Sequence, residues 1–266
     1  MARRTPCREL DIRDVVEGDS LCRVLCYPSG DSICCYNRLE ELSRLGITGV
    51  YSFGDVQIEK GVWVVGKGHA AIVALAQHML YGLVALKIRR VDSKRDSLEE
   101  EGMLLETVSR LGYAPKPISY SKNFIAREYV DGSTLERILK EGDGGKIKKA
   151  IVSLVKAAFA IDSIGVDVEE IVNPTKQIIY LCNDLEKPMF IDLESARLRP
   201  HSSNVTKIIS FIIRMISKDR VGSSDMSSKR IVLLELAKKY KVTMDVRQRE
   251  DIVGELLMYI QELFAG

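Results

Sequence analysis

The chain has 266 residues, which suffices for one large domain or for two lobes, and for a substantial hydrophobic core. Apolar residues make up 46% and charged residues 29%, a composition that excludes an intrinsically disordered chain. The net charge of +2 does not indicate a nucleic-acid or membrane partner. No apolar run approaches the ~18 residues of a transmembrane helix, and the polar N-terminal sequence lacks a secretory signal. We therefore expect a cytoplasmic protein.

The cysteines are concentrated early in the chain. Five precede residue 36, and one stands alone later: Cys7, Cys22, Cys26, Cys34, Cys35 and Cys182. Their spacing allows a zinc site, but adjacent cysteines rarely bind one ion well, so buried thiols or a disulfide are favoured. The scarcity of Asn and Gln beside many charged residues is typical of thermophiles, whose cytosolic proteins can carry disulfides.

The first elements predicted are a helix and a strand. Residues 36–46 have leucines three apart and end on Gly46, which predicts a short amphipathic helix. A strand is expected at 47–53, and Gly54-Asp55 is expected to form a turn.

From residue 56 the pattern changes to successive strands with one helix. Strands are expected at 62–65, 70–76, 82–88 and 124–130. The helix is expected at 96–111, where Ser97 and Glu100 resemble a capping box.

In the second half of the chain, the spacing of apolar residues is mainly that of helices. Helices are expected at 133–141, 146–164, 203–217, 228–240 and 246–264, and short strands at 178–182 and 188–191. Strands followed by helices indicate an α+β fold.

Two glycines, Gly66 and Gly68, lie between predicted strands. Glycines in such a hairpin let backbone N–H groups approach phosphate oxygens closely, although an ordinary turn has the same appearance. The segment is not a Walker-type loop, because no Gly-Lys-Ser/Thr opens a helix there.

Lys87 ends an apolar strand, where a buried ammonium group would need an anionic partner. Glu101 follows fourteen residues later on the predicted helix and could be that partner. The alternative is that Lys87 begins an exposed basic patch with Arg89 and Arg90.

Two further segments suit a nucleotide. The extended segment 124–132 could present its backbone groups to a nucleobase. Asp192 follows an apolar strand, where a carboxylate can bind Mg²⁺ that bridges phosphates. The alternative for Asp192 is a turn or helix-capping role.

These features stand in the order found in protein kinases, and the chain resembles that superfamily over about residues 36–215. More closely, it resembles the short archaeal predicted serine/threonine protein kinases, which are related to the RIO and KEOPS-complex kinases. The resemblance implies ATP and Mg²⁺ as ligands. The nucleotide-binding positions it implies are Gly66, Gly68, Val73, Ala85, Lys87, Glu101, Glu128 and Val130, with Ala71 replacing a third glycine.

The resemblance also implies a two-lobed kinase-like α+β fold, with an antiparallel sheet and one helix in the N-lobe and a mainly helical C-lobe. Residues 1–55 are then an N-terminal extension, 56–130 the N-lobe and 131–266 the C-lobe. Asp192 matches the metal-binding aspartate and Asn173 is assigned as a second metal ligand. Glu170 and Lys87 are the expected catalytic residues.

The catalytic loop departs from the family pattern. Val168 stands where a histidine is usual and Glu170 where an aspartate is usual. Asn173 follows Glu170 by three residues, too early for the usual metal ligand, whose position falls on Thr175. Asp167 is a rival to Glu170 if the register differs.

Arg127 falls at the position before the hinge, where an apolar residue usually lines the adenine pocket. A guanidinium there needs an anion, and Glu101 is one candidate. If Arg127 took Glu101, Lys87 would lose its partner.

Three functional hypotheses follow. The first is an ATP:Mg²⁺-dependent phosphotransferase acting on a serine or threonine hydroxyl, with a protein substrate. The second is a pseudokinase scaffold with a degenerate catalytic loop, and the third a small-molecule kinase. The third normally keeps a His-x-Asp loop, which is missing here.

Overall fold

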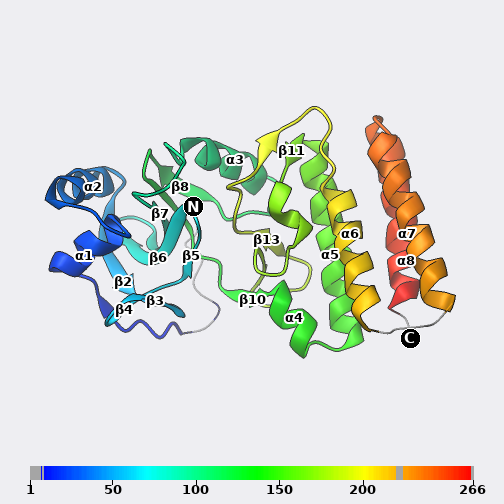
Figure 1. Ribbon diagram of the computed structural model, residues 1–266, viewed down its shortest axis with the longest axis horizontal. Coiled ribbons are helices and arrows are strands. Elements are labelled where there is room, and N and C mark those ends of the chain that lie inside the picture. Colours follow the sequence, from blue (N-terminus) through cyan, green and yellow to red (C-terminus); the bar gives the residue numbers. More distant parts are fainter. Residues whose placement is uncertain (1–6, 8, 220–223, 265–266) are drawn as a thin grey trace. The chain divides into compact units, whose positions relative to one another are not determined.

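A computed structural model describes residues 7, 9–219 and 224–264. The chain forms two compact units: Met1–Ser109 with Pro115–Asp131, and Arg110–Ala114 with Gly132–Gly266. The fold is α+β, with an antiparallel sheet in the first unit and mainly helices in the second (Figure 1). No helix in the described ranges is both long and apolar enough to cross a membrane.

The sheet of the first unit follows the order β1-β2-β6-β7-β9-β8, with every neighbouring pair antiparallel and β5 paired to β6. Its strands are β1 Asp14–Val15, β2 Ile47–Ser52, β5 Gly66–Lys67, β6 Ala71–His78, β7 Gly82–Arg89, β8 Pro117–Tyr120 and β9 Phe124–Glu128. A separate hairpin joins β3 Val56–Glu59 to β4 Val62–Val64. The strands predicted from the alternation of apolar residues are confirmed, with ends displaced by a few residues.

The residues before position 56 are built into this sheet. Strand β2 pairs with β6, and helices α1 (Gly18–Leu25) and α2 (Ser32–Arg44) precede it. Helix α2 begins four residues before the predicted start, because the Asp31 carboxylate accepts the Cys34 N–H and caps it there. The division predicted at residues 55 and 130 stays a prediction, and helix α1 was not predicted.

Two disulfides join α1 to α2. They link Cys22 to Cys35 and Cys26 to Cys34. The disulfide interpretation is therefore confirmed for these four residues, and the zinc interpretation of them is wrong.

Helix α2 is also anchored to the sheet through a buried arginine. Arg38 donates to the carbonyls of Leu25 and Arg89 and, at 3.3 Å, to the amide oxygen of Asn123. Glu41 accepts both the backbone N–H and the side-chain amide of Asn123, at 2.9 and 2.7 Å. Burial, and secondarily the neighbouring Arg89, lowers the pKa of Arg38 to about 10.

Helix α3 (Glu99–Ser109) lies against β8 of the same unit. Its start differs from the predicted capping box. The Ser97 hydroxyl accepts the N–H of Glu99 and donates to the Glu99 carboxylate, so Glu99 takes the role predicted for Glu100.

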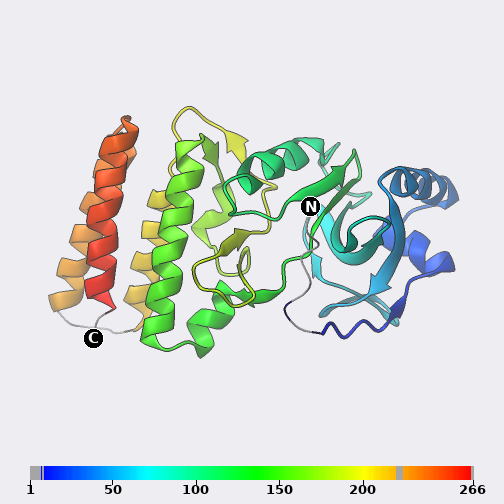
Figure 2. The same ribbon diagram turned by 180° about the vertical axis from the view of Figure 1, so that it is seen from behind.

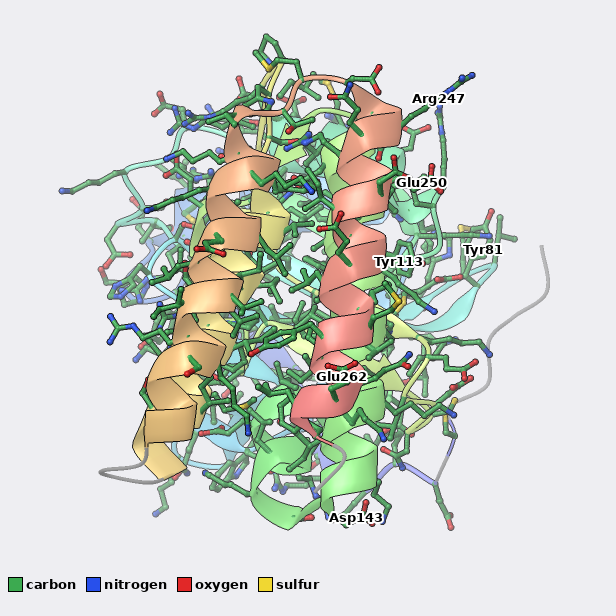
Figure 3. The ribbon with its side chains drawn as sticks, turned by 90° about the vertical axis from the view of Figure 1, so that its right-hand side faces the viewer. Tyr81, Tyr113, Asp143, Arg247, Glu250 and Glu262 are labelled. Atoms are coloured by element: carbon green, nitrogen blue, oxygen red, sulfur yellow. A yellow bond between two sulfur atoms is a disulfide. The ribbon has the colours of Figure 1, made fainter. Side chains whose placement is uncertain are left out.

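In the second unit the long helix α5 packs against α6 and α8 (Figure 2). The helices are α4 Leu135–Glu141, α5 Gly144–Ser163, α6 Asn204–Asp219, α7 Ser224–Val242 and α8 Val246–Leu263. Figure 3 shows α7 and α8 side by side, with Arg247 and Glu250 near one end of α8 and Glu262 near the other. All five predicted helices are confirmed within a few residues.

Short strands of the second unit flank the segments that contain Glu170, Asn173 and Asp192. Strands β10 (Gly132–Thr134), β12 (Ile178–Leu181) and β13 (Pro188–Phe190) form one sheet. Strand β11 (Val166–Asp167) pairs with β14 (Arg197–Leu198).

Candidate functional site

Several predicted nucleotide-binding residues form one row across the sheet of the first unit. Gly66 on β5 is paired with Val73 on β6, which is paired with Lys87 on β7. Directly paired residues of antiparallel strands point to the same face, and so do residues two apart on one strand. Ala85 therefore shares this face with Val73 and Lys87.

The glycine hairpin between β5 and β6 is closed tightly at its base. The N–H of Gly68 donates to the Ala71 carbonyl at 2.8 Å. A Cβ added at Gly66 would meet open space, and one at Gly68 would make only an ordinary contact with Ala71. Neither residue has a positive φ, so the fold itself does not demand glycine at these two positions. The glycines leave the hairpin backbone uncovered.

Lys87 and Glu101 form a buried ion pair. Lys87 Nζ lies 2.6 Å from Glu101 Oε1, and the two residues are 5% and 4% exposed. The pairing predicted from the spacing of these residues is confirmed, and Lys87 does not belong to an exposed basic patch. A buried ion pair is retained at a cost in desolvation, so it calls for an explanation beyond stability.

Gly102 lets helix α3 lie close enough to the sheet for Glu101 to reach Lys87. A Cβ at Gly102 would lie 2.5 Å from the ring of Tyr120 on β8. Glycine inside a helix is unfavourable by about 1 kcal/mol relative to alanine, so its presence is explained by this close packing. Glu101 precedes Gly102 and is thereby held over β7.

Arg127 lies on β9 opposite Ala85, and only 6% of it is exposed. The concern that it would take Glu101 from Lys87 is resolved, because Lys87 holds Glu101 at hydrogen-bond distance. The guanidinium nevertheless replaces the apolar wall expected at this position.

The predicted hinge residues follow on the same strand. The N–H of Glu128 donates to the Lys116 carbonyl at 2.9 Å, and its carboxylate accepts the Lys116 N–H at 3.1 Å. Val130 is 7% exposed. These contacts fix the backbone between β9 and residue 131.

In the second unit, Glu170 lies on a short 3-10 helix, η1 (Glu169–Val172), and Asn173 is the C-terminal capping residue of that helix. The Asn173 N–H donates to the Glu170 carbonyl at 3.0 Å. The Asn173 side chain accepts the Thr175 hydroxyl at 3.3 Å, so these two metal-ligand candidates contact each other.

Asp192 follows strand β13, as predicted, and its carboxylate accepts the Glu194 N–H at 3.1 Å. Two contacts connect its segment to that of Glu170. The Glu170 N–H donates to the Ser195 hydroxyl at 3.2 Å. Gln177 donates to the Glu170 carboxylate at 3.4 Å and accepts the Ile191 N–H at 3.0 Å.

Asp167, the rival to Glu170, has a structural role. Its carboxylate is paired with Lys207 at 2.8 Å and with Arg199 at 3.5 Å, and Asp167 is 6% exposed. Lys207 also donates to the Val168 carbonyl at 2.9 Å. These contacts fix the backbone just before Glu170, which makes Glu170 the better candidate to meet a substrate.

Sequence reasoning missed Gln177, Ser195 and Lys207 as members of this arrangement. None belongs to a motif, and each acts through a contact between segments that are distant in sequence. Only the long helix that carries Lys207 was visible in the periodicity.

A cavity of about 770 Å³ in the second unit borders this segment. Val172, Asn173 and Thr175 line one part of it, and Phe211 and Arg214 of α6 line another. Its volume lies in the range of small-molecule sites. No family model and no curated protein matches the chain.

Proposed function

We propose that this chain is an ATP:Mg²⁺-dependent phosphotransferase with a two-lobed, kinase-like architecture, acting on a serine or threonine hydroxyl. The observation that carries the proposal is the buried pair between Lys87 on β7 and Glu101 on α3. A strand lysine held by a helix glutamate is the device by which kinases position nucleotide phosphates. The glycine hairpin, in register with Lys87 through Val73, supports the same interpretation.

In this proposal Lys87 contacts phosphate oxygens, and Glu101 keeps its ammonium group extended. Val73 and Ala85 provide apolar surface for the base, and the backbone at Glu128 and Val130 supplies its hydrogen bonds. Such a site works mainly by positioning and by neutralising charge.

The residues present fit magnesium. Asp192 and Asn173 offer oxygen donors, which Mg²⁺ prefers, and Mg²⁺ commonly takes only one or two protein carboxylates with phosphates and water completing its shell. Within the described ranges no three His, Cys, Asp or Glu side chains gather as a metal cage. When bound, the ion would neutralise phosphate charge.

Glu170 is the residue that would orient the acceptor hydroxyl and receive its proton. Its backbone is fixed through Ser195, and its carboxylate accepts a long hydrogen bond from Gln177. The neighbouring cavity supplies space beside η1 for an acceptor group.

A pseudokinase scaffold is the second candidate. It is favoured by the contact between Asn173 and Thr175, since the amide oxygen that would bind the metal already accepts this hydrogen bond. Arg127 favours it as well, because a buried guanidinium is a poor wall for adenine.

Calorimetric titration with ATP tests the proposal, with and without Mg²⁺, on the wild type and on Asp192→Ala. We expect Mg²⁺-dependent binding that the variant loses. Asp184→Ala is a matched control, because Asp184 is a partly exposed turn aspartate after β12 that accepts the Glu186 N–H. Absence of ATP binding at millimolar concentration would refute the enzyme proposal.

A further inference from the structure

The glycine hairpin between β5 and β6 has two different faces. Gly66 and Val73 lie on the face of the sheet that carries Lys87. Successive residues of a strand point to opposite faces, so Lys67 points to the other face, which we call the rear face. Its partner on β6 is Ile72, which is completely buried in the core of the first unit. The hairpin can therefore be anchored from the rear face without covering the face that carries Lys87.

Tyr27 contacts the hairpin from the rear face. Lys67 Nζ lies 5.1 Å from the centroid of the Tyr27 ring, and the guanidinium carbon of Arg90 lies 5.3 Å from it. Both distances are within the roughly 6 Å range of cation–π attraction. Tyr27 is half-buried and packs against the core cluster that contains Ile72. An aromatic ring from the segment before β2 therefore joins the hairpin to the core.

Arg90 connects the same ring to the backbone of the hairpin. Arg90 Nη1 donates to the Gly68 carbonyl at 3.0 Å, and the Arg90 N–H donates to the Ala70 carbonyl at 2.8 Å. The Asp92 carboxylate accepts Arg90 Nε and Nη2, at 2.8 and 2.7 Å. The Arg90 side chain is 16% exposed. One guanidinium, fixed by Asp92, thus contacts both the Tyr27 ring and the end of the hairpin.

The position of Tyr27 is itself fixed by its surroundings. Its carbonyl accepts the Val91 N–H at 2.9 Å, which joins it to the chain just after β7. Cys26, the residue before it, is 1% exposed and forms a disulfide with Cys34 of α2. The two helices before β2 therefore give the ring a fixed support beside the hairpin.

We propose that Tyr27 is a positioning residue of the nucleotide site, which holds the glycine hairpin through Lys67 and Arg90 in the conformation that receives phosphates. This inference rests on the proposed function and deepens it. A binding loop that is ordered before its ligand arrives loses less conformational freedom on binding, so anchoring raises affinity. Because its contacts lie on the rear face, Tyr27 acts through the hairpin and not by touching the nucleotide.

Amide hydrogen exchange of the protein without nucleotide tests the anchoring itself. The Gly68 N–H, bonded to the Ala71 carbonyl, reports on opening of the hairpin. The Met79 N–H, bonded to the Gly46 carbonyl at the other end of β6, is the reference. Tyr27→Leu should raise exchange at Gly68 about fivefold, the effect of losing cation–π contacts, and leave Met79 unchanged. Tyr27→Phe keeps the ring and should exchange like wild type.

Lys67→Gln tests the same contact from the hairpin side, and Lys67 is exposed, so this variant should fold. It should also raise exchange at Gly68, and its effect should be less than additive with that of Tyr27→Leu. Tyr36→Leu is the matched control, because Tyr36 is a 69% exposed tyrosine of α2. Unchanged exchange at Gly68 in Tyr27→Leu, an equal rise at Gly68 and Met79, or an equal rise in Tyr27→Phe would overturn the inference.

Calorimetric titration with ATP in Mg²⁺ tests the consequence for binding. Tyr27→Leu should bind ATP about fivefold more weakly than wild type, whereas Tyr27→Phe and Tyr36→Leu should bind it equally well. Equal ATP affinities in wild type and Tyr27→Leu would overturn the positioning role alone. Failure of wild type to bind any nucleotide would overturn the proposed function, and the exchange measurement would still decide separately whether Tyr27 anchors the hairpin.

Discussion

The carboxylate of Asp162, near the end of α5, accepts a hydrogen bond from the Tyr240 hydroxyl of α7 at 2.9 Å. The same carboxylate accepts the N–H groups of Asn204 and Val205, at 2.7 and 3.1 Å, and so caps α6. Arg249 of α8 stacks over the Tyr240 ring at 4.1 Å. One buried acid thus joins three helices of the second unit, and the stacked Arg249 connects α8 to the same cluster.

This arrangement predicts a pH effect on stability. Burial raises the pKa of Asp162 above its ordinary value of 3.8, so the folded state binds this proton more tightly than the unfolded chain does. Ionisation of Asp162 therefore lowers the unfolding free energy as pH rises from about 3.8 to the folded-state pKa. Asp162→Asn cannot ionise, so its stability relative to wild type should improve over that window. Urea unfolding across the pH range measures the difference.

Asp143→Asn is the control of opposite sign. Asp143 caps α5 (Figure 3), and its hydrogen bond from the Lys146 N–H lowers the pKa of Asp143. Its contribution is present above the unfolded-state pKa and lost as pH falls, so this variant should lose stability relative to wild type as pH rises. A gap between Asp162→Asn and wild type that is constant with pH would contradict the assignment.

The ion pair of Lys87 and Glu101 predicts a strong coupling in stability. Lys87→Met or Glu101→Leu alone should destabilise the first unit by roughly 3–5 kcal/mol, because each removes one member of a buried ion pair and leaves the other charge buried. The double variant should lose much less stability than the sum of the two single losses, since it removes both charges. Additive effects in denaturant titrations would show that the pair is not formed in solution.

The glycine hairpin predicts a separation of binding from stability. Gly66→Ala has open space and no positive φ to violate, so it should keep or raise stability by up to ~1 kcal/mol. It should nevertheless weaken ATP binding, because the added methyl group covers the hairpin backbone. Gly102→Ala is the contrasting variant and should lose stability against Tyr120. Unchanged ATP affinity in Gly66→Ala would contradict a phosphate-binding role for the hairpin.

Much of the fold was predictable because its signals are local. Five helices of the second unit and the four sheet strands β2, β6, β7 and β9 follow from the sequence pattern, whereas β1, β5 and β8 were not predicted. The pair of Lys87 and Glu101 follows from a fixed spacing on a strand and a helix. The structure adds the reason for the close approach, which is the packing of Gly102 on Tyr120.

The parts that could not be predicted depend on contacts between distant segments. Helix α1 is only eight residues long, and disulfides to α2 hold it in place. The structural role of Asp167 depends on Lys207, forty positions away. No local pattern contains these relationships.

The disulfides predict a redox-dependent stability of the first unit. They close short spans of 13 and 8 residues, and each should contribute roughly 2–3 kcal/mol. Reduction, or the paired substitution of Cys22 and Cys35 by serine, should therefore lower the melting temperature. The measurement is a thermal scan with a parallel thiol titration. An unchanged melting temperature after complete reduction would contradict a stabilising role.

Release or transfer of the ATP γ-phosphate, followed under single-turnover conditions, tests the central claim most directly. We predict slow Mg²⁺-dependent turnover by the wild type and a reduction of about 10²-fold or more in Glu170→Gln, with ATP affinity retained. Asp167→Asn is the companion variant, and it should lose stability first, because Lys207 loses its charged partner. Tight ATP binding without turnover in the wild type, or equal turnover by Glu170→Gln, would contradict the phosphotransferase account as written.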